Sequence, residues 1–398
     1  MKKFGPGLLV TAAFIGPGSI ATASAAGANT GFVLLWALLF SLVATMVLQE
    51  MAARLGLVSG NGLSQALRTT FSNPVISRTA VILVVAAIGV GNAAYEAGNI
   101  SGAALGLQTL LPLPASASAL VLGGLAGLLL AGGGYKLLEP ILIVLVLIMS
   151  TVFVVTMLMI DLDFGAMLAG MAKPSIPAGS ALTVVALIGT TVVPYNLFLH
   201  ANIVQEKWRG VSTEQAISES RTDTVISIGL GGLITLAVMS TSAVAFFNTG
   251  AEFSASSLAT QLEPVLGTAA NALFAFGLMA AGLTSAITAP LAAAYAVSGA
   301  MGWPTDFADR HFKAVWVLVL AVGTLFAALG TKPIAAILFA QAANGLLLPI
   351  TAVYLIIIMN RADLLGEYRN RLVSNLLAVA VVAVVTGLGL WNIVRLFV

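Results

Sequence analysis

Charged residues are scarce in this chain, and cysteine is absent. Of 398 residues, 8% are Asp, Glu, Lys or Arg, whereas a soluble protein usually carries about 25%. The absence of cysteine excludes disulfides and thiolate metal ligands. With only two histidines, His200 and His311, the chain also lacks the clustered titratable groups that a membrane-embedded enzyme needs. We therefore expect neither a soluble protein nor an enzyme, and no cofactor.

Long apolar runs take the place of the missing charge. Hydrophobic residues make up 59% of the chain, and a helix that spans a membrane needs about 20 apolar residues in succession. The stretches between these runs are too short for a soluble domain, so the sequence predicts one all-α integral membrane domain over residues 1–398, surrounded by the lipid bilayer. The eleven predicted spans are 6–26, 32–55, 79–108, 116–133, 137–160, 180–204, 220–248, 267–299, 314–329, 334–359 and 373–396.

Basic residues predict how these helices are oriented. If the N-terminus is cytoplasmic and the helices alternate, all but three of the 17 Lys and Arg residues lie in cytoplasmic segments. The exceptions are Lys173, Lys332 and Arg395. Cytoplasmic loops are enriched in Lys and Arg, so we expect a bacterial inner (cell) membrane protein with an extracytoplasmic C-terminus. Because Gly16–Gly18 interrupts the first apolar run, we expect that helix to remain uncleaved.

Two predicted helices carry matching interruptions. The first reads Ile-Gly-Pro-Gly-Ser at 15–19, and the second reads Ile-Gly-Thr-Thr-Val-Val-Pro-Tyr-Asn at 188–196. Proline removes a backbone donor and glycine weakens a helix, and the freed backbone groups are tolerated in a membrane only where they line a buried cavity. A pair of interrupted helices in corresponding positions indicates the substrate site of a secondary transporter. The alternative is two kinked helices that bind nothing.

The positions of the interruptions predict a repeat. With helices 1 and 6 broken, residues 5–160 and 180–360 form two halves of five helices each, and the helix at 373–396 is an addition. Halves with an odd number of helices enter the membrane from opposite sides, which predicts an inverted repeat. An ion channel is the competing class, but the sequence lacks the re-entrant filters and charged rings expected of a channel. We therefore favour a transporter.

Motifs along the chain also match a known family in order and spacing. They are Gly5-Pro6-Gly7, Gly16-Pro17-Gly18, Gln49 with Ala53-Arg54-Leu55-Gly56, Ser59-Gly60 with Leu63, Pro194 with Asn196-Leu197 and Leu199-His200, Ala280-Ala281-Gly282 with Ser285 and Thr288, and Gln341 with Pro349. In these residues the chain resembles the Nramp (natural resistance-associated macrophage protein) divalent-metal transporters over nearly its whole length. The resemblance implies a LeuT-like fold, with eleven transmembrane helices, and secondary active transport of a divalent metal cation by alternating access.

The residues that would bind the metal depart from the family pattern. The family's helix 1 reads Asp-Pro-Gly-Asn, where this chain has Gly16–Ser19, and its helix 6 reads Met-Pro-His, where this chain has Val193–Tyr195. A carboxylate, an amide and a thioether are therefore replaced. The resemblance leaves Gln341 and the backbone carbonyls at Ala13 and Thr190 as ligands, and all of these groups are neutral.

Two substrate hypotheses follow. A dication that has lost its water needs negative charge nearby, so neutral groups would hold only a partly hydrated ion, such as Mg²⁺, and would not select Mn²⁺ or Fe²⁺. The alternative is a small polar or anionic organic solute, bound at the positive end of the half-helix that begins near Ser19. Metal ligands thus stay unassigned, and the residues expected to contact the small ion or small molecule are Ala13, Gly16, Gly18, Ser19, Thr190, Val193, Tyr195, Asn196 and Gln341.

Glu96 is the acidic residue that we place deepest in the membrane, within the span 79–108. Ionisable residues in such positions indicate function by default. Glu96 matches a family position in the proton pathway, Asn99 stands where the family has a second acid, and His200 matches a family histidine near the same route, although the family's helix 9 arginine has no counterpart in 315–329. The alternatives are a Glu96 that only links helices and a neutral, packed His200. We expect a proton or cation as co-substrate, coupled through Glu96, Asn99 and His200, and no nucleic-acid partner.

Overall fold

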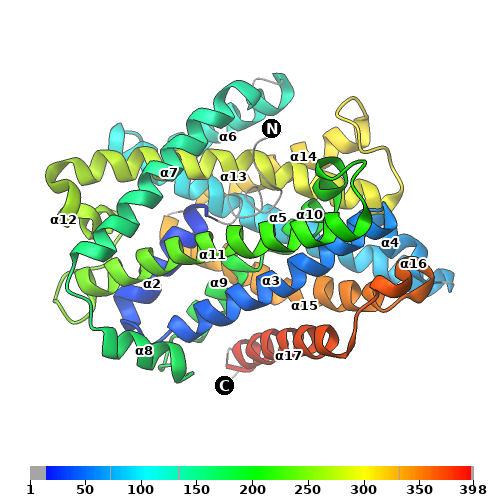
Figure 1. Cartoon of the computed structure of the whole chain (residues 1–398). Helices are drawn as coiled ribbons and strands as arrows, with labels where there is room; N and C mark the ends of the chain where they lie inside the picture. Colours follow the sequence, from blue (N-terminus) through cyan, green and yellow to red (C-terminus); the bar gives the residue numbers. More distant parts are fainter. Residues whose placement is uncertain (1–14, 72, 133–134, 331, 396–398) are drawn as a thin grey trace.

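The protein is a bundle of helices. The computed structural model describes residues 15–71, 73–132, 135–330 and 332–395. Every regular element within these ranges is a helix, which confirms the predicted all-α class. The long helices lie side by side and run mostly from left to right in Figure 1, so that their loops gather at the two ends of the bundle.

Ten helices among the described residues are long and apolar enough to cross a membrane. Each coincides with a predicted span, and the first predicted span lies partly outside the described residues and ends as α2. The elements that form the spans are α2 (Pro17–Thr30), α3 (Leu35–Ser59), α5 (Pro74–Leu110), α6 (Ala115–Gly132), α7 (Tyr135–Met159), α9 (Ala181–Thr191), α10 (Pro194–Lys207), α11 (Thr213–Phe246), α13 (Ala270–Met301), α14 (Arg310–Leu329), α15 (Pro333–Met359) and α17 (Leu372–Arg395).

Stretches that the sequence suggested as loops contain short helices. In α8, the Asp163 side chain accepts a hydrogen bond from the Ala166 N–H at 2.9 Å and caps the first turn. In the loop between α8 and α9, the Ser175 carbonyl accepts a hydrogen bond from the Trp36 indole of α3 at 2.9 Å. The short elements are α4 (Leu63–Thr70), α8 (Phe164–Ala172), η1 (Leu258–Leu262), α12 (Glu263–Leu266), η2 (Gly267–Ala269), α16 (Ala362–Leu365) and η3 (Gly366–Tyr368).

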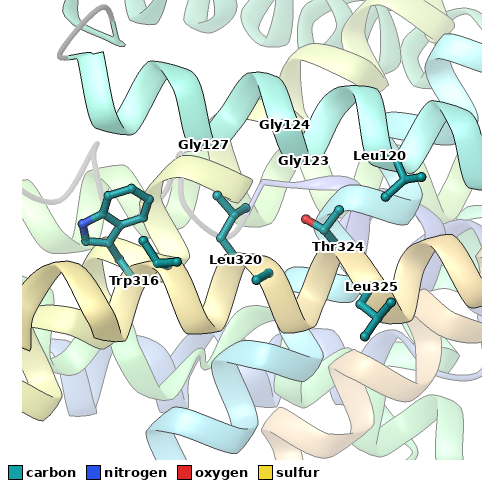
Figure 2. Close-up of a pocket in the computed structure, with 10 residues that line it drawn as sticks. Leu120, Gly123, Gly124, Gly127, Trp316, Leu320, Thr324 and Leu325 are labelled. Carbon is teal, nitrogen blue, oxygen red and sulfur yellow. The ribbon is translucent and has the colours of Figure 1, made fainter.

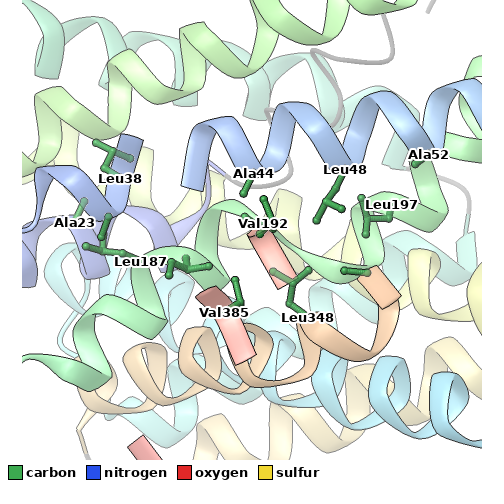
Figure 3. Close-up of a cluster of buried hydrophobic side chains, with 14 of the residues drawn as sticks. Ala23, Leu38, Ala44, Leu48, Ala52, Leu187, Val192, Leu197, Leu348 and Val385 are labelled. Atoms are coloured by element: carbon green, nitrogen blue, oxygen red, sulfur yellow. The ribbon is translucent and has the colours of Figure 1, made fainter. Parts of the chain in front are cut away.

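Glycine allows the central helices to approach closely. A Cβ built on Gly106 of α5 would lie 2.5 Å from the Ala275 carbonyl oxygen of α13, and one built on Gly27 of α2 would lie 2.1 Å from the Met239 carbonyl oxygen of α11. Small residues serve this purpose in membrane proteins because packing, rather than the hydrophobic effect, holds the helices together. Figure 3 shows the apolar core that these contacts surround, with side chains from α2, α3, α9, α10, α15 and α17.

A cluster of charged side chains lies at the right-hand end of the bundle in Figure 1, near α4 and α16, and Arg54 is its buried member. Glu50 and Arg54, four residues apart on α3, form an ion pair with 2.9 Å between Oε2 and Nη2, and Arg221 of α11 joins Glu50 at 2.8 Å. Arg54 also donates to the Tyr368 carbonyl at 2.6 Å and to Asn370 Oδ1 at 2.9 Å. This cluster connects α3 and α11 to the segment that leads into α17.

Candidate functional site

The sixth predicted span is interrupted as expected, but later than its glycine. α9 ends at Thr191 and α10 begins at Pro194. Val193 adopts an extended conformation (φ −80°, ψ 119°), because the ring of a following proline disfavours the helical region. Gly189 lies within α9, and its role is close packing, since a Cβ there would lie 1.9 Å from the Gln341 carbonyl oxygen of α15. The interpretation of Gly189 as part of the break was therefore wrong.

The same local rule shapes the first interruption. α2 begins at Pro17, and Gly16 before it is extended (φ −109°, ψ −175°). The N-cap residue of α2 is Gly16, which has no side chain that could cap the first turn. Ala13, a predicted contact, lies outside the described residues.

The two interruptions meet inside the bundle. Ser19 in the first turn of α2 and Thr190 in the last turn of α9 share a hydrogen bond of 2.9 Å between their hydroxyl oxygens. Both side chains are buried, as are the neighbouring predicted contacts Val193 and Asn196 on the α10 side. Two segments 171 positions apart in the chain therefore form one junction, as the matching motifs predicted.

Gln341 of α15 lies against the start of α2. A Cβ built on Gly18 would lie 2.1 Å from Gln341 Nε2, so only glycine leaves room for this carboxamide. The side chain is 0% exposed, and neither Nε2 nor Oε1 has a hydrogen-bond partner. An unpaired buried amide costs roughly 1–3 kcal/mol. Buried polar groups of this kind are normally satisfied, so within the described residues Gln341 keeps its hydrogen-bonding capacity available.

Ser285 and Tyr95 complete the junction, and the sequence did not single them out as contacts. A Cβ built on Gly16 would lie 2.8 Å from Ser285 Oγ and 4.0 Å from the Tyr95 hydroxyl. Ser285 Oγ is buried and has no hydrogen-bond partner. The ring of Tyr95 packs edge-on against that of Tyr195, with 5.5 Å between the centroids, so Tyr195 forms a wall of the junction. The sequence offered one indication of this role for Ser285, because Ser285 belongs to a motif that carries the family resemblance.

The junction contains no carboxylate among the described residues. Glu96 is the only acidic residue in their buried set, and it bonds to Asn99, whose Nδ2 donates to Oε2 at 3.2 Å. Residues 1–14 contain neither Asp nor Glu. In addition, the described residues hold no group of three or more His, Asp or Glu side chains that could bind a metal ion. The groups that face a substrate here are hydroxyls, a carboxamide and backbone.

The predicted coupling residues form two separate hydrogen-bonded pairs. Glu96 and Asn99 lie on α5, where Glu96 packs against α14 so closely that a Cβ on Gly323 would lie 2.5 Å from its Cγ. His200 on α10 instead pairs with Gln49 of α3, with 2.9 Å between Nδ1 and Oε1. All four side chains are buried, and Glu96 Oε1, Asn99 Oδ1 and His200 Nε2 each lack a hydrogen-bond partner.

A groove of about 550 Å³ lies away from this junction, between α6 and α14 (Figure 2). Its lining consists of apolar residues and glycines with one hydroxyl, from Thr324, and it includes none of the predicted contacts. Gly123 allows α6 to pack against Thr324, since a Cβ there would lie 2.2 Å from the hydroxyl oxygen. Its polar groups are limited to the Thr324 hydroxyl and the Trp316 indole N–H, so the groove offers a solute few polar contacts.

Known proteins resemble the chain over its whole length. The divalent metal cation transporter MntH of Yersinia pestis (strain Pestoides F) is 29% identical over 408 residues, covering 100% of this chain and 95% of the relative. The protein of the same name from Aeromonas hydrophila is 27% identical and covers 100% and 96%.

Two solved structures share the fold. The manganese transporter of Eremococcus coleocola, in complex with an aromatic bis-isothiourea compound, superposes with a TM-score of 0.77 at 22% identity, over 98% of this chain and 85% of that one. Mhp1, a nucleobase-cation-symport-1 family transporter in a closed conformation, gives 0.57 at 14% identity, over 97% and 91%. The family model "Natural resistance-associated macrophage protein-like" matches residues 7–395. The chain therefore belongs to the Nramp family and is a membrane transporter, not an enzyme.

Proposed function

We propose that this protein is a secondary transporter that works by alternating access and binds its substrate at the junction of α2, α9–α10 and α15. The observation that carries the proposal is Gln341, whose buried carboxamide lies beside the start of α2 with both polar ends unpaired among the described residues. A substrate with polar groups would satisfy this amide. The two five-helix halves, 5–160 and 180–360, are the repeats that would move against each other.

The substrate that we favour is a small polar or anionic organic solute. The uncapped N-terminal end of α2 carries partial positive charge, and Gln341 Nε2 and the Ser285 hydroxyl can donate hydrogen bonds beside it. The described junction contributes no carboxylate of its own, but Glu96 lies close enough to interact electrostatically with Tyr95 and Tyr195 in its wall. An anion at the junction therefore requires Glu96 to be uncharged. The hydroxyls of Ser19 and Thr190 would lie at the same place once their mutual hydrogen bond opens.

A divalent cation is the second candidate, favoured by the relatives named as divalent metal cation transporters. Here the Gln341 and Thr190 oxygens would contact an ion that keeps part of its water shell, because the described residues supply neither a carboxylate nor a soft thioether ligand. Neutral oxygen ligands suit Mg²⁺ better than Mn²⁺ or Fe²⁺. Such a site would bind without transition-metal selectivity.

Calorimetry on the purified protein distinguishes the candidates. We expect no saturable binding of Mn²⁺ or Mg²⁺ at micromolar concentration, and we expect small carboxylates and amino acids, tested as a panel, to include a solute that raises the melting temperature. Gln341→Ala should remove that rise. Saturable binding of Mg²⁺, with or without Mn²⁺ binding of similar affinity, would establish the second candidate instead of the first. Selective, saturable Mn²⁺ binding to the unaltered chain would contradict both candidates. The double variant Gly16→Asp with Val193→Met, which supplies a carboxylate and a thioether, is the positive control for Mn²⁺.

A further inference from the structure

A segment between α11 and α13 is inserted into the end of the bundle where α2 and α11 finish. It contains η1, and its Leu258, Gln261 and Leu262 side chains are at most 1% exposed. Phe253 in the same segment packs edge-on against Phe246 at the end of α11, with 5.5 Å between the ring centroids. The segment therefore acts as a plug at this end, near α8 and α12 in Figure 1.

Gln261 makes the hydrogen bonds that link the plug to α2 and α11. Gln261 Nε2 donates to Ser24 Oγ of α2 at 3.0 Å and to the Leu258 carbonyl at 2.7 Å, and Thr241 of α11 donates to Gln261 Oε1 at 3.3 Å. Ser242 of α11 in turn donates to the Ser24 carbonyl at 2.7 Å. Three elements distant in the sequence thus meet in one neutral, buried hydrogen-bonded cluster.

The position of this cluster relates it to the candidate substrate site. Ser24 lies five residues beyond Ser19 on α2, a rise of about 7.5 Å along a helix. α2 and α11 are in backbone contact at Gly27 and Met239, which closes the seam between those two helices. The plug meets α2 at Ser24 through side-chain hydrogen bonds with Gln261. Side-chain hydrogen bonds can break and re-form by rotation, so this contact can open while α2 and α11 stay packed.

We propose that Gln261, Ser24 and Thr241 form a latch that closes the path from this end of the bundle to the junction, and that Gln261 is its gating residue. Neutral polar groups suit such a role, because they are satisfied by each other when the latch is closed and by water when it is open. Apolar side chains would instead favour the closed state. With the proposed orientation, this path leads to the extracytoplasmic side.

Because the chain has no cysteine, a single introduced thiol reports the state of the latch. Thr22 lies between Ser19 and Ser24 on α2 and is 0% exposed. In detergent, Thr22→Cys should react slowly with a charged methanethiosulfonate reagent, and adding Gln261→Ala should raise the rate by at least about fivefold, as expected when one or two hydrogen bonds are lost from the closed state. The conservative Gln261→Glu, which loses the donor, should also raise it.

Two controls separate gating from a loss of structure. Gln215→Ala, at the opposite end of α11, should leave the Thr22→Cys rate unchanged. A thiol at Leu197→Cys on α10, on the far side of the junction and also 0% exposed, should not react faster when Gln261 is replaced. An unchanged Thr22→Cys rate in both Gln261 variants, or an equal rise at both thiols, would overturn the proposal. None of these outcomes depends on which substrate is carried.

Discussion

At the scale of single residues, two features define the site: the space left by glycines that lack a Cβ, and buried polar side chains without hydrogen-bond partners among the described residues. Gly16 and Gly18 leave room for Ser285 and Gln341 beside the start of α2, and both of these side chains have buried polar atoms without partners. Gly189 has a different role, because its missing Cβ allows α9 to touch the α15 backbone. Glycines with the same local sequence context thus serve either recognition or packing.

Gly189→Ala should destabilise the protein. A methyl group 1.9 Å from the Gln341 carbonyl oxygen forces α9 and α15 apart, and overpacking of this kind costs about 1–3 kcal/mol. The measurement is the thermal unfolding midpoint in detergent. Gly124→Ala is the matched control, because nothing lies within 4 Å of a Cβ at that α6 position, and its midpoint should stay level or rise. Equal unfolding midpoints for the two variants would show that the close approach of α9 and α15 at Gly189 does not contribute to stability.

Glu96→Gln should uncouple transport from its driving gradient. If Glu96 binds the proton or coupling cation, the Gln side chain of the variant keeps the size and the hydrogen bonds of Glu96 but lacks the negative charge that binds the ion. We expect concentrative uptake into proteoliposomes to be lost while exchange of substrate across the membrane persists. Asn99→Asp is the companion variant, since it adds a second acid beside Glu96 Oε2. Concentrative uptake that survives in Glu96→Gln would assign Glu96 a structural role.

At the scale of elements, proline decides where the broken helices begin again. Pro17 and Pro194 both occupy the first position of a helix and hold the residue before them extended. At the membrane boundary, α14 begins differently, with Asp309 accepting hydrogen bonds from the His311 and Phe312 N–H groups at 2.8 and 3.1 Å. Helix starts inside the bundle are thus left open, whereas this one at the surface is capped.

The cap of α14 predicts a pH dependence. The Phe312 N–H bond, followed by those of His311, lowers the pKa of Asp309 below its ordinary value. A carboxylate with a depressed pKa contributes stability above its unfolded pKa, and this is lost as pH falls through the lower folded value, so the window lies below about pH 4. In a His311→Gln background, Asp309→Asn should keep the cap and remove the acid loss, measured as the change in unfolding midpoint between pH 6 and pH 3. An unchanged acid loss in that variant would assign it to other carboxylates.

At the scale of the whole molecule, the helix order agrees with the predicted spans, because long apolar runs leave the backbone no other way to satisfy its hydrogen bonds in lipid. The division into two inverted halves stays a prediction, as does the orientation. The cluster of Arg54, Glu50 and Arg221 lies at one end of the bundle and the Gln261 latch at the other. The proposed orientation makes the charged end cytoplasmic, in keeping with the enrichment of basic residues there.

The orientation can be measured with reporters fused to the C-terminus. An extracytoplasmic C-terminus should give alkaline phosphatase activity in a bacterial host and no fluorescence from a fused green fluorescent protein, because the first folds only outside the cytoplasm and the second only within it. A fusion after Gly366, on the loop before α17, should give the opposite pattern. The same pattern at both positions would show that α17 does not cross the membrane.

Much of the fold could be predicted because its signals are local, whereas the contacts that close the site are not. The breaks at Pro17 and Pro194 and the burial of Glu96 follow from sequence patterns. The hydrogen bond between Gln261 and Ser24 joins residues 237 positions apart, and the hydrophobic periodicity of the sequence cannot predict such a contact. Gly16 and Gly189 both follow isoleucine in the sequence, and only the neighbouring helix decides whether the missing Cβ makes room for a side chain, as at Gly16, or for backbone, as at Gly189.

The contacts of Arg54 set a limit on how far this protein can be simplified. A ten-helix version that ended before Tyr368 would retain the buried guanidinium but remove two of its acceptors, the Tyr368 carbonyl and Asn370 Oδ1. Arg54 would keep its ion pair with Glu50 but would lose the acceptors for its remaining N–H groups, and leaving buried donors unpaired costs about 1–3 kcal/mol. Deleting the last helix, by truncation or in the design of a minimal transporter, therefore has to be accompanied by new acceptors for the Arg54 guanidinium.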